Sequence, residues 1–163
     1  METIVPAGPA DTDSVRKLSE ALFQPYGGFG QLLTRFFSTQ GVTTFLAREG
    51  EQAVGFVMFG FLPWSHDPAD DVWIADLLAL GVLPGHQRRG VGQRLLERML
   101  QVSEEMAGWR ELREIQLTCA ADNHAALAFF GRFGFQVRDR SHGRFSSGQE
   151  AWRLARPLTA GRA

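Results

Sequence analysis

A short polar turn at residues 87–92, QRRGVG, has the composition of an anion-binding site. Apolar residues recur at three- and four-residue intervals over residues 91–106, so the turn leads directly into a predicted helix. The first backbone N–H groups of a helix have no partner inside it, and the helix dipole places partial positive charge beside them. The two glycines leave this backbone uncovered and the two arginines add full charges, so we expect the turn to bind a pyrophosphate.

Three segments resemble the GNAT superfamily of acyl-CoA-dependent N-acetyltransferases. Residues 87–92 match its [RQ]-x-x-G-x-[GA] signature, and residues 80–84, LGVLP, stand where the family usually has an L-A-V-x-P strand end. Residues 123–135, NHAALAFFGRFGF, are similar to its N-x-x-A-x-x-x-[YF]-x-x-x-G-F segment. The resemblance covers residues 45–156 well and the N-terminal part by its layout only.

The resemblance implies a mixed α/β fold with a mostly antiparallel sheet of about six or seven strands and helices on both faces. Its fourth and fifth strands splay apart, and the pantetheine arm of acetyl-CoA pairs with the freed backbone of Leu80, Gly81 and Val82. The full set of expected acetyl-CoA contacts is Leu80, Gly81, Val82, Gln87, Arg88, Arg89, Gly90, Val91, Gly92, Gln93, Asn123, Phe129 and Phe130. No metal site is expected.

Asp76 is the only charged residue in the apolar run 72–82, which predicts a buried strand. Acyl transfer to an amine requires the amine to lose a proton, and a lysine-like amine with a pKa of about 10.4 is almost fully protonated at neutral pH. Burial raises the pKa of an unpaired carboxyl, which favours Asp76 as the general base. The alternative is a carboxylate that only binds a backbone amide or an arginine. His66 and His124 are weaker catalytic candidates.

Phe130 departs from the family pattern, because the family usually has a tyrosine at this position that protonates the leaving thiolate. A phenyl ring donates no proton, but a thiol with a pKa of about 8.5 is already a fair leaving group, and His124, Cys119, Ser65 or water could act instead. The alternative is an acyl-CoA-binding module with little or no catalysis. Phe130 is otherwise a core residue or a wall beside the CoA sulfur. Asn123 is expected to cap a helix, to bind pantetheine, or both. We interpret Cys119 as a buried small apolar residue.

The composition is that of one globular domain over residues 1–163, with residues 157–163 as a frayed tail. A net charge of −1 predicts no general attraction to nucleic acid or to an acidic membrane. A single cysteine, with neither a signal peptide nor a membrane span in the sequence, favours a cytoplasmic protein. It is expected to be a monomer or a homodimer that binds acetyl-CoA and an amine acceptor.

The predicted elements alternate between strands and amphipathic helices. Strands are expected over residues 2–6, 42–48, 53–62, 72–82, 114–118, 135–138 and 150–155, and helices over 11–24, 29–37, 91–107 and 123–133. The aromatic stripe of the second helix is expected to be core or part of the acceptor site, and residues 63–71 and 139–148 to be loops, the first with Trp64 anchored or in contact with substrate. Together these features predict an acetyl-CoA-dependent N-acetyltransferase that acts on a primary amine of a small molecule or protein by direct transfer in a ternary complex.

Overall fold

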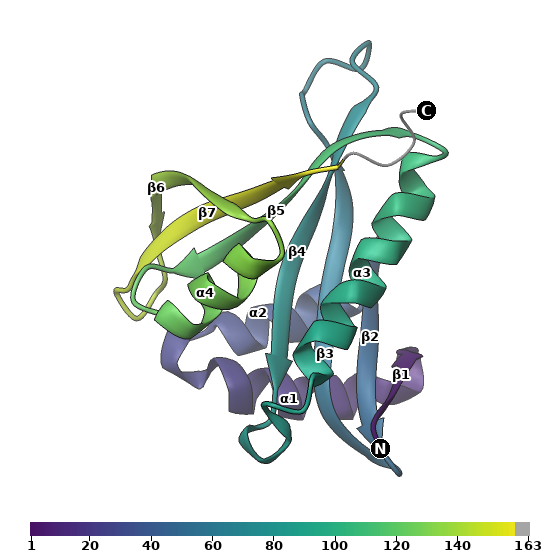
Figure 1. Cartoon of the computed structure of the whole chain (residues 1–163), viewed down its shortest axis with the longest axis vertical. Helices are drawn as coiled ribbons and strands as arrows, with labels where there is room; N and C mark the ends of the chain where they lie inside the picture. The colour runs from purple at the N-terminus through teal and green to yellow at the C-terminus, as the bar shows by residue number, and fades with distance from the viewer. Residues whose placement is uncertain (159–163) are drawn as a thin grey trace. The chain divides into compact units, whose positions relative to one another are not determined.

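The computed structural model describes residues 1–158, which form a seven-stranded sheet in the order β1-β2-β3-β4-β5-β7-β6 (Figure 1). The chain divides into two compact units. The first unit contains Met1–Gly60 and Leu78–Val102, and the second contains Phe61–Leu77 and the chain from Ser103 onward. Among the described residues, no helix is long and apolar enough to cross a membrane.

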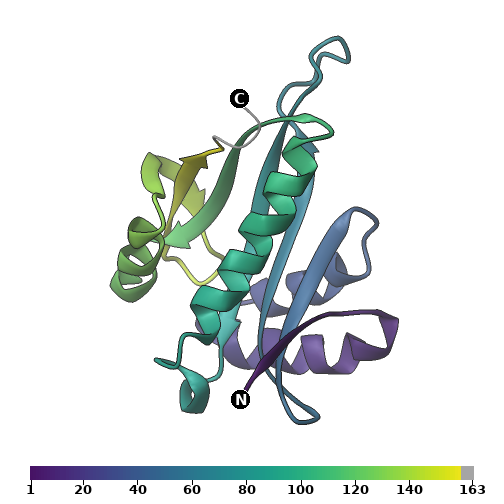
Figure 2. The ribbon, with the colours of Figure 1, turned by 45° about the vertical axis from the view of Figure 1, so that its right-hand side comes forward.

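The first unit combines an antiparallel ribbon with two helices. β1 (Thr3–Pro6) pairs with β2 (Val42–Glu49), and β2 pairs with β3 (Gln52–Pro63). The helices α1 (Thr12–Phe23) and α2 (Phe29–Phe37) lie side by side, and the start of α3 (Val91–Ala107) also belongs to this unit (Figure 2). Short 3-10 turns occupy Pro9–Asp11, Gln24–Tyr26 and Pro84–His86.

The core of the first unit lies between α1, α2 and the sheet. Its buried residues are Val15, Leu18, Leu33, Leu46, Phe56, Met58 and Ala79. Phe29, Phe36 and Phe37 of α2 pack against this cluster. The aromatic stripe of α2 is therefore a packing face, which was one of the two roles expected for it.

The second unit contains one parallel and two antiparallel strand pairs among the described residues. β4 (Val72–Val82) runs parallel to β5 (Glu111–Ala120), with a register that ends at Leu77↔Leu117. β5 pairs antiparallel with β7 (Glu150–Pro157), which pairs with β6 (Gln136–Arg144), and α4 (His124–Arg132) connects β5 to β6. Within the described chain, the last residues of β4, Leu78–Val82, have no partner in the register with β5, as expected if the two strands separate there.

Two strand predictions were too short, and the structure corrects them. β5 extends over Glu111–Ala120, and β6 continues through Arg144 into the segment predicted as a loop. β6 is an edge strand with polar residues on both faces and an irregular register with β7, so it shows no apolar alternation. Pro157 ends β7 and is not part of a frayed tail; the rest of the predicted tail, from residue 159 on, lies outside the described residues.

Gly30 allows α1 and α2 to approach closely. A Cβ atom at this position would lie 2.6 Å from the carbonyl oxygen of Ser19, which is backbone and cannot rotate away. Both Gly30 and Ser19 are buried. Glycine at position 30 therefore sets the separation of the two helices.

We expect Gly30→Ala to lower the free energy of unfolding by about 1–3 kcal/mol, because the added methyl group forces α2 away from α1. Gly131→Ala is the matched control: Gly131 is exposed in α4 with open space at its Cβ position, so stability should stay level or rise by up to about 1 kcal/mol. Urea unfolding of the three proteins measures both effects. Equal stability of Gly30→Ala and the parent would contradict this close packing.

Candidate active site

The loop that joins β4 to α3 has the backbone shape of an anion-binding site. After the 3-10 turn Pro84–His86, Arg88 has φ 63° and Gly90 has φ 78°, both in the left-handed region. Arg88 is the only non-glycine residue with positive φ among residues 1–158. Such strain is typical of functional loops, and left-handed residues in a turn direct successive N–H groups into one concavity.

The N–H groups of this loop are free to receive a ligand. Arg94 N–H donates to the Gly90 carbonyl at 3.0 Å, which closes the first turn of α3. Within the described part of the chain, the N–H groups from Arg88 to Gln93 donate to no other residue. Val91 is almost fully buried and anchors the start of the helix, whereas Arg88, Arg89, Gly90 and Gln93 are exposed.

The polar side chains of the loop differ in their availability. Arg88 is exposed and forms no ion pair with residues 1–158, so its charge is free for a ligand. Arg89 instead contacts Glu2 at 3.4 Å and Glu49 at 3.8 Å. Gln87 donates its side-chain amide to the Val82 carbonyl at 2.9 Å. Gln93 donates to a glutamate one turn further along α3. Arg88 is therefore available to a ligand, whereas Arg89 and Gln87 hold the loop in place.

A buried carboxylate holds the loop against β1. The Glu2 side chain is 6% exposed, and Arg94 donates both to its carboxylate at 3.2 Å and to its carbonyl oxygen at 2.7 Å. The hydrogen bond from its own backbone, followed by those from His86 and Arg89, holds the pKa of Glu2 below its usual value. Side-chain ligand atoms of Glu2, Glu49 and His86 lie within 4.8 Å of one another, but the two arginines already neutralise these acids. We therefore interpret the cluster as an ion-pair network.

The end of β4 packs tightly against α1 and β3 at Gly81. A Cβ atom at Gly81 would lie 2.8 Å from Cδ1 of Leu22, and one at Gly55 would lie 2.8 Å from the Gly81 carbonyl oxygen. Val82 is buried, while Leu80 and Gly81 are partly exposed. Backbone contacts of residues 80–82 with a ligand remain a prediction, consistent with the end of the β4–β5 register at Leu77.

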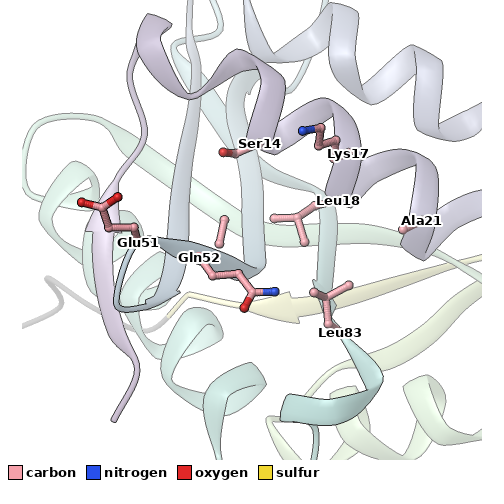
Figure 3. A pocket seen from close by; sticks show the side chains of 8 residues that line it. Ser14, Lys17, Leu18, Ala21, Glu51, Gln52 and Leu83 are labelled. Carbon is pink, nitrogen blue, oxygen red and sulfur yellow. The ribbon is translucent and has the colours of Figure 1, made fainter.

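A separate pocket of about 370 Å³ lies in the first unit between α1, the β2–β3 turn and Leu83 (Figure 3). Lys17 of α1 and Glu51 of the turn are the charged residues in its lining. Lys17 is engaged by Asp13 at 2.9 Å. None of the predicted site residues lines this pocket, and we assign it no role.

Asp76 lies in the second unit, in the half of β4 that pairs with β5. Burial raises the pKa of its carboxyl above the usual value, and the attraction of Arg153 on β7 opposes part of that rise. Asp76 makes no hydrogen bond or ion pair with the described residues. It is therefore not a carboxylate tied to a backbone amide or in direct contact with an arginine, and it is suited to take up a proton.

Asp76 belongs to a row of polar side chains on one face of the second unit. Its register partner on β5 is Gln116, and Glu114 and Thr118 follow on the same face because side chains alternate along a strand. Thr118 is opposite Arg153 of β7, and Nη2 of Arg153 lies 3.4 Å from Nε2 of His142 on β6. Glu114 accepts a hydrogen bond from Gln116 at 2.8 Å.

The sequence reasoning missed Arg153, His142 and the β5 residues of this face. The signal for the β5 row was the alternation of Glu114, Gln116 and Thr118 with apolar neighbours, which a period-two strand with one polar face explains. For His142, no such signal existed, because β6 carries polar residues on both faces.

No hydrogen bond or ion pair joins the other catalytic candidates to Asp76 among the described residues. His66 is exposed in the loop before β4, whereas Asp76 is four residues inside the strand, roughly 13 Å from its start. Trp64 in the same loop is 40% exposed and anchored by Arg113, whose guanidinium carbon lies 4.6 Å from the ring centroid. His124 is exposed at the first turn of α4.

The residues of the α4 segment have structural roles. The Asn123 side chain accepts a hydrogen bond from the Ala126 N–H at 3.2 Å, which confirms its capping role. Phe130 is buried and packs edge-on against Phe129 and Phe135, with ring centroids 5.2 Å and 5.5 Å away. Burial raises the pKa of the Cys119 thiol to about 11, so it remains protonated at neutral pH.

The fold and the loop together define a protein with an open mixed sheet in which one strand leads into a helix start that is suited to bind an anion. A family model for the acetyltransferase (GNAT) family matches residues 13–135. An N-alpha-acetyltransferase of Saccharolobus solfataricus is 25% identical over 155 residues, covering 91% of this chain and 88% of that protein.

Solved structures share the fold over nearly the whole chain. Arabidopsis thaliana NAA60 in complex with a bisubstrate analogue has a TM-score of 0.80 at 14% identity, with 98% and 99% of the two chains covered. The ribosomal-protein-S18-alanine N-acetyltransferase from Escherichia coli has a TM-score of 0.73 at 21% identity, with 100% and 99% covered. The chain belongs to the acetyltransferase (GNAT) family and is an N-acetyltransferase.

The raised pKa of Asp76 gives a prediction for stability. Between its unfolded and folded pKa values the folded protein binds the Asp76 proton more tightly, so this group makes stability fall as pH rises through that range. Asp76→Asn keeps the side-chain shape and removes this titration. We expect its free energy of unfolding, relative to the parent, to increase from about pH 4 to about pH 8 in denaturant titrations. A difference that does not change with pH would show that burial does not disfavour the Asp76 charge.

Proposed function

We propose that this enzyme transfers an acetyl group from acetyl-CoA to a primary amine of a small molecule or protein, by direct transfer in a ternary complex. The observation that carries the proposal is the loop from Arg88 to Gln93, whose N–H groups are unpaired within the described chain beside one free arginine. These donors and the charge of Arg88 fit the diphosphate of the CoA moiety. Arabidopsis thaliana NAA60 has also been solved in complex with acetyl-CoA.

The acetyl thioester supplies an activated carbonyl group. Residues of β4 are proposed to orient the pantetheine arm and to deprotonate the amine. Backbone groups of Leu80, Gly81 and Val82 pair with the amides of the pantetheine arm. Asp76 accepts the proton that the amine loses as its nitrogen forms a bond to the carbonyl carbon. The carbon–sulfur bond then breaks, and solvent protonates the departing thiolate.

Direct transfer is favoured over a covalent enzyme intermediate. Cys119 is buried and its raised pKa keeps the thiol protonated, so it is a poor nucleophile. Phe130 cannot protonate the leaving group, but a thiol with a pKa of about 8.5 leaves readily without strong acid assistance. The enzyme therefore does not need the tyrosine that its family usually has at this position.

The comparisons favour an α-amine as the acceptor. The relative from Saccharolobus solfataricus is named an N-alpha-acetyltransferase, and the similar structure from Escherichia coli acts, by its name, on an alanine of a ribosomal protein. These names support an N-terminal α-amine as one acceptor class for this chain. A cytoplasmic location, a monomeric or homodimeric state and a site without metal are likewise proposed from the sequence.

An acyl-CoA-binding module with little catalysis is the alternative, favoured by Phe130. Release of free thiol from acetyl-CoA over a panel of amines separates the two. An enzyme releases thiol only when a suitable amine is present, whereas a binding module binds acetyl-CoA and releases none with any amine.

Asp76→Asn tests the base. We expect kcat to fall by about 10²- to 10⁴-fold, because the amine loses its proton acceptor, with little change in the affinity for acetyl-CoA measured by calorimetry. In the parent, the pH at which activity rises should lie above the usual range of an aspartate, as its raised pKa requires. A variant with parental kcat would remove Asp76 from the mechanism.

Arg88→Glu tests the diphosphate site. Reversal of the one free charge in the loop should weaken acetyl-CoA binding by at least about tenfold, because a charge-assisted contact is lost and a repulsion is added. Arg35→Glu is the matched control. Arg35 is exposed at the end of α2, and its substitution changes the net charge by the same amount. Calorimetric titration with acetyl-CoA gives both affinities. Equal weakening in the two variants would indicate a general charge effect and not a contact.

A further inference from the structure

Arg153 is a partly buried cation that has no carboxylate partner among residues 1–158. It projects from β7 on the same face as Thr118, its register partner on β5. Among the described residues its only close polar contact is Nε2 of His142, at 3.4 Å, and it forms no ion pair. A guanidinium has five N–H donors, so the described part of the chain leaves most of the hydrogen-bonding capacity of Arg153 unused.

The charged groups around Arg153 leave its charge uncompensated. On β6, Asp139 is its register partner, but the Asp139 carboxylate accepts a hydrogen bond from the Ser141 N–H at 2.7 Å and lies beyond ion-pair distance of Arg153. On β4, Asp76 attracts Arg153 only at longer range. On β5, Glu114 is paired with Arg138 at 3.2 Å. No carboxylate of the described chain is therefore bound to this guanidinium.

His142 orients the guanidinium without neutralising it. Burial, and then the neighbouring charge of Arg153, lower the pKa of His142, so the imidazole is neutral at neutral pH. A neutral ring with an unprotonated Nε2 accepts a hydrogen bond from Nη2 of Arg153. The arginine keeps its full positive charge while one edge of the guanidinium is held in place.

We propose that Arg153, oriented by His142, binds a carboxylate carried by the amine acceptor, so that the enzyme prefers acceptors that bear a negative charge. A planar guanidinium with free parallel N–H groups matches a carboxylate in a bidentate geometry. Thr118, exposed directly opposite Arg153, offers a hydroxyl group to the same ligand. This inference rests on the proposed function, because it names the class of amine that the enzyme acetylates.

The strand spacing sets the separation between the two ends of such an acceptor. β4 and β7 are both neighbours of β5, so their backbones are about 10 Å apart. An amine at Asp76 and a carboxylate at Arg153 are therefore several bonds apart in the acceptor. A peptide with an acidic side chain near its N-terminus and a long ω-amino acid share this chemistry.

Matched acceptors test the charge preference. The first set pairs straight-chain ω-amino acids with alkylamines of equal length, and the second pairs short peptide amides that differ only by aspartate or asparagine after the first residue. For the parent we expect the kcat/KM of the charged member of at least one set to exceed that of its neutral partner by roughly 10- to 100-fold. A preference in the first set indicates a small-molecule acceptor, and a preference in the second set indicates a peptide acceptor.

Arg153→Gln should abolish this preference by raising KM for the charged acceptors roughly 10- to 100-fold, with KM for the neutral acceptors little changed. Arg153→Lys should restore part of it, because a lysine keeps the charge but not the bidentate geometry. Arg140→Gln is the control: Arg140 is an exposed β6 arginine that stacks on Trp152 at 5.0 Å and should leave the preference intact. Thermal unfolding shows whether each variant is folded.

Two results would overturn the inference. One is a parent with equal kcat/KM for the charged and neutral acceptors of both sets. The other is an Arg153→Gln variant whose kcat/KM falls equally for the charged and the neutral acceptor of a set. Calorimetric binding of the same acceptors in the presence of CoA provides a readout without turnover. If acetyl-CoA binds but no amine releases thiol, the proposed function fails. The carboxylate site is then still supported by tighter binding of the charged acceptors to the parent than to Arg153→Gln, and is contradicted by equal binding.

Discussion

The proposed anion-binding loop depends on one buried carboxylate close to the N-terminus. Glu2 receives Arg94 from the first turns of α3 and Arg89 from the loop itself, and its carbonyl oxygen binds Arg94 again. These contacts tie β1 to the start of α3, while Gln87 ties the loop to the end of β4. Of the two left-handed residues in the loop, only Arg88 adopts a conformation that is costly for its residue type, because glycine adopts it freely. The free N–H groups from Arg88 to Gln93 are held in position by the Glu2 and Gln87 contacts before any ligand arrives, which reduces the entropy lost on binding.

The two halves of β4 have different proposed roles, the first as the position of the base and the second as the approach to the diphosphate site. Its first half pairs with β5 up to Leu77 and includes Asp76, opposite Gln116, where burial raises the pKa of the carboxyl. Its second half belongs to the first unit and leads into the loop.

The strength of the local signal explains which elements could be predicted. β4 begins and ends at the expected residues Val72 and Val82, because a continuous apolar run between polar turns is unambiguous. α3 was equally clear from its helical periodicity and the turn before it. β6 was missed beyond Arg138 because an exposed edge strand needs no apolar alternation, and its hydrogen bonds to β7 are a tertiary feature.

The sequence by itself determined the local chemistry of this protein: a glycine- and arginine-rich turn before a helix, one aspartate in an apolar strand, and an asparagine at a helix start. These depend on residues close in the chain, whose spacing directly encodes backbone geometry and burial. Only the tertiary structure decided that Arg88 is free while Arg89 is bound to Glu2, and that Arg153 and His142 share one sheet face with Asp76. These relations join residues far apart in the chain, and strand register and long-range ion pairs create them only after folding.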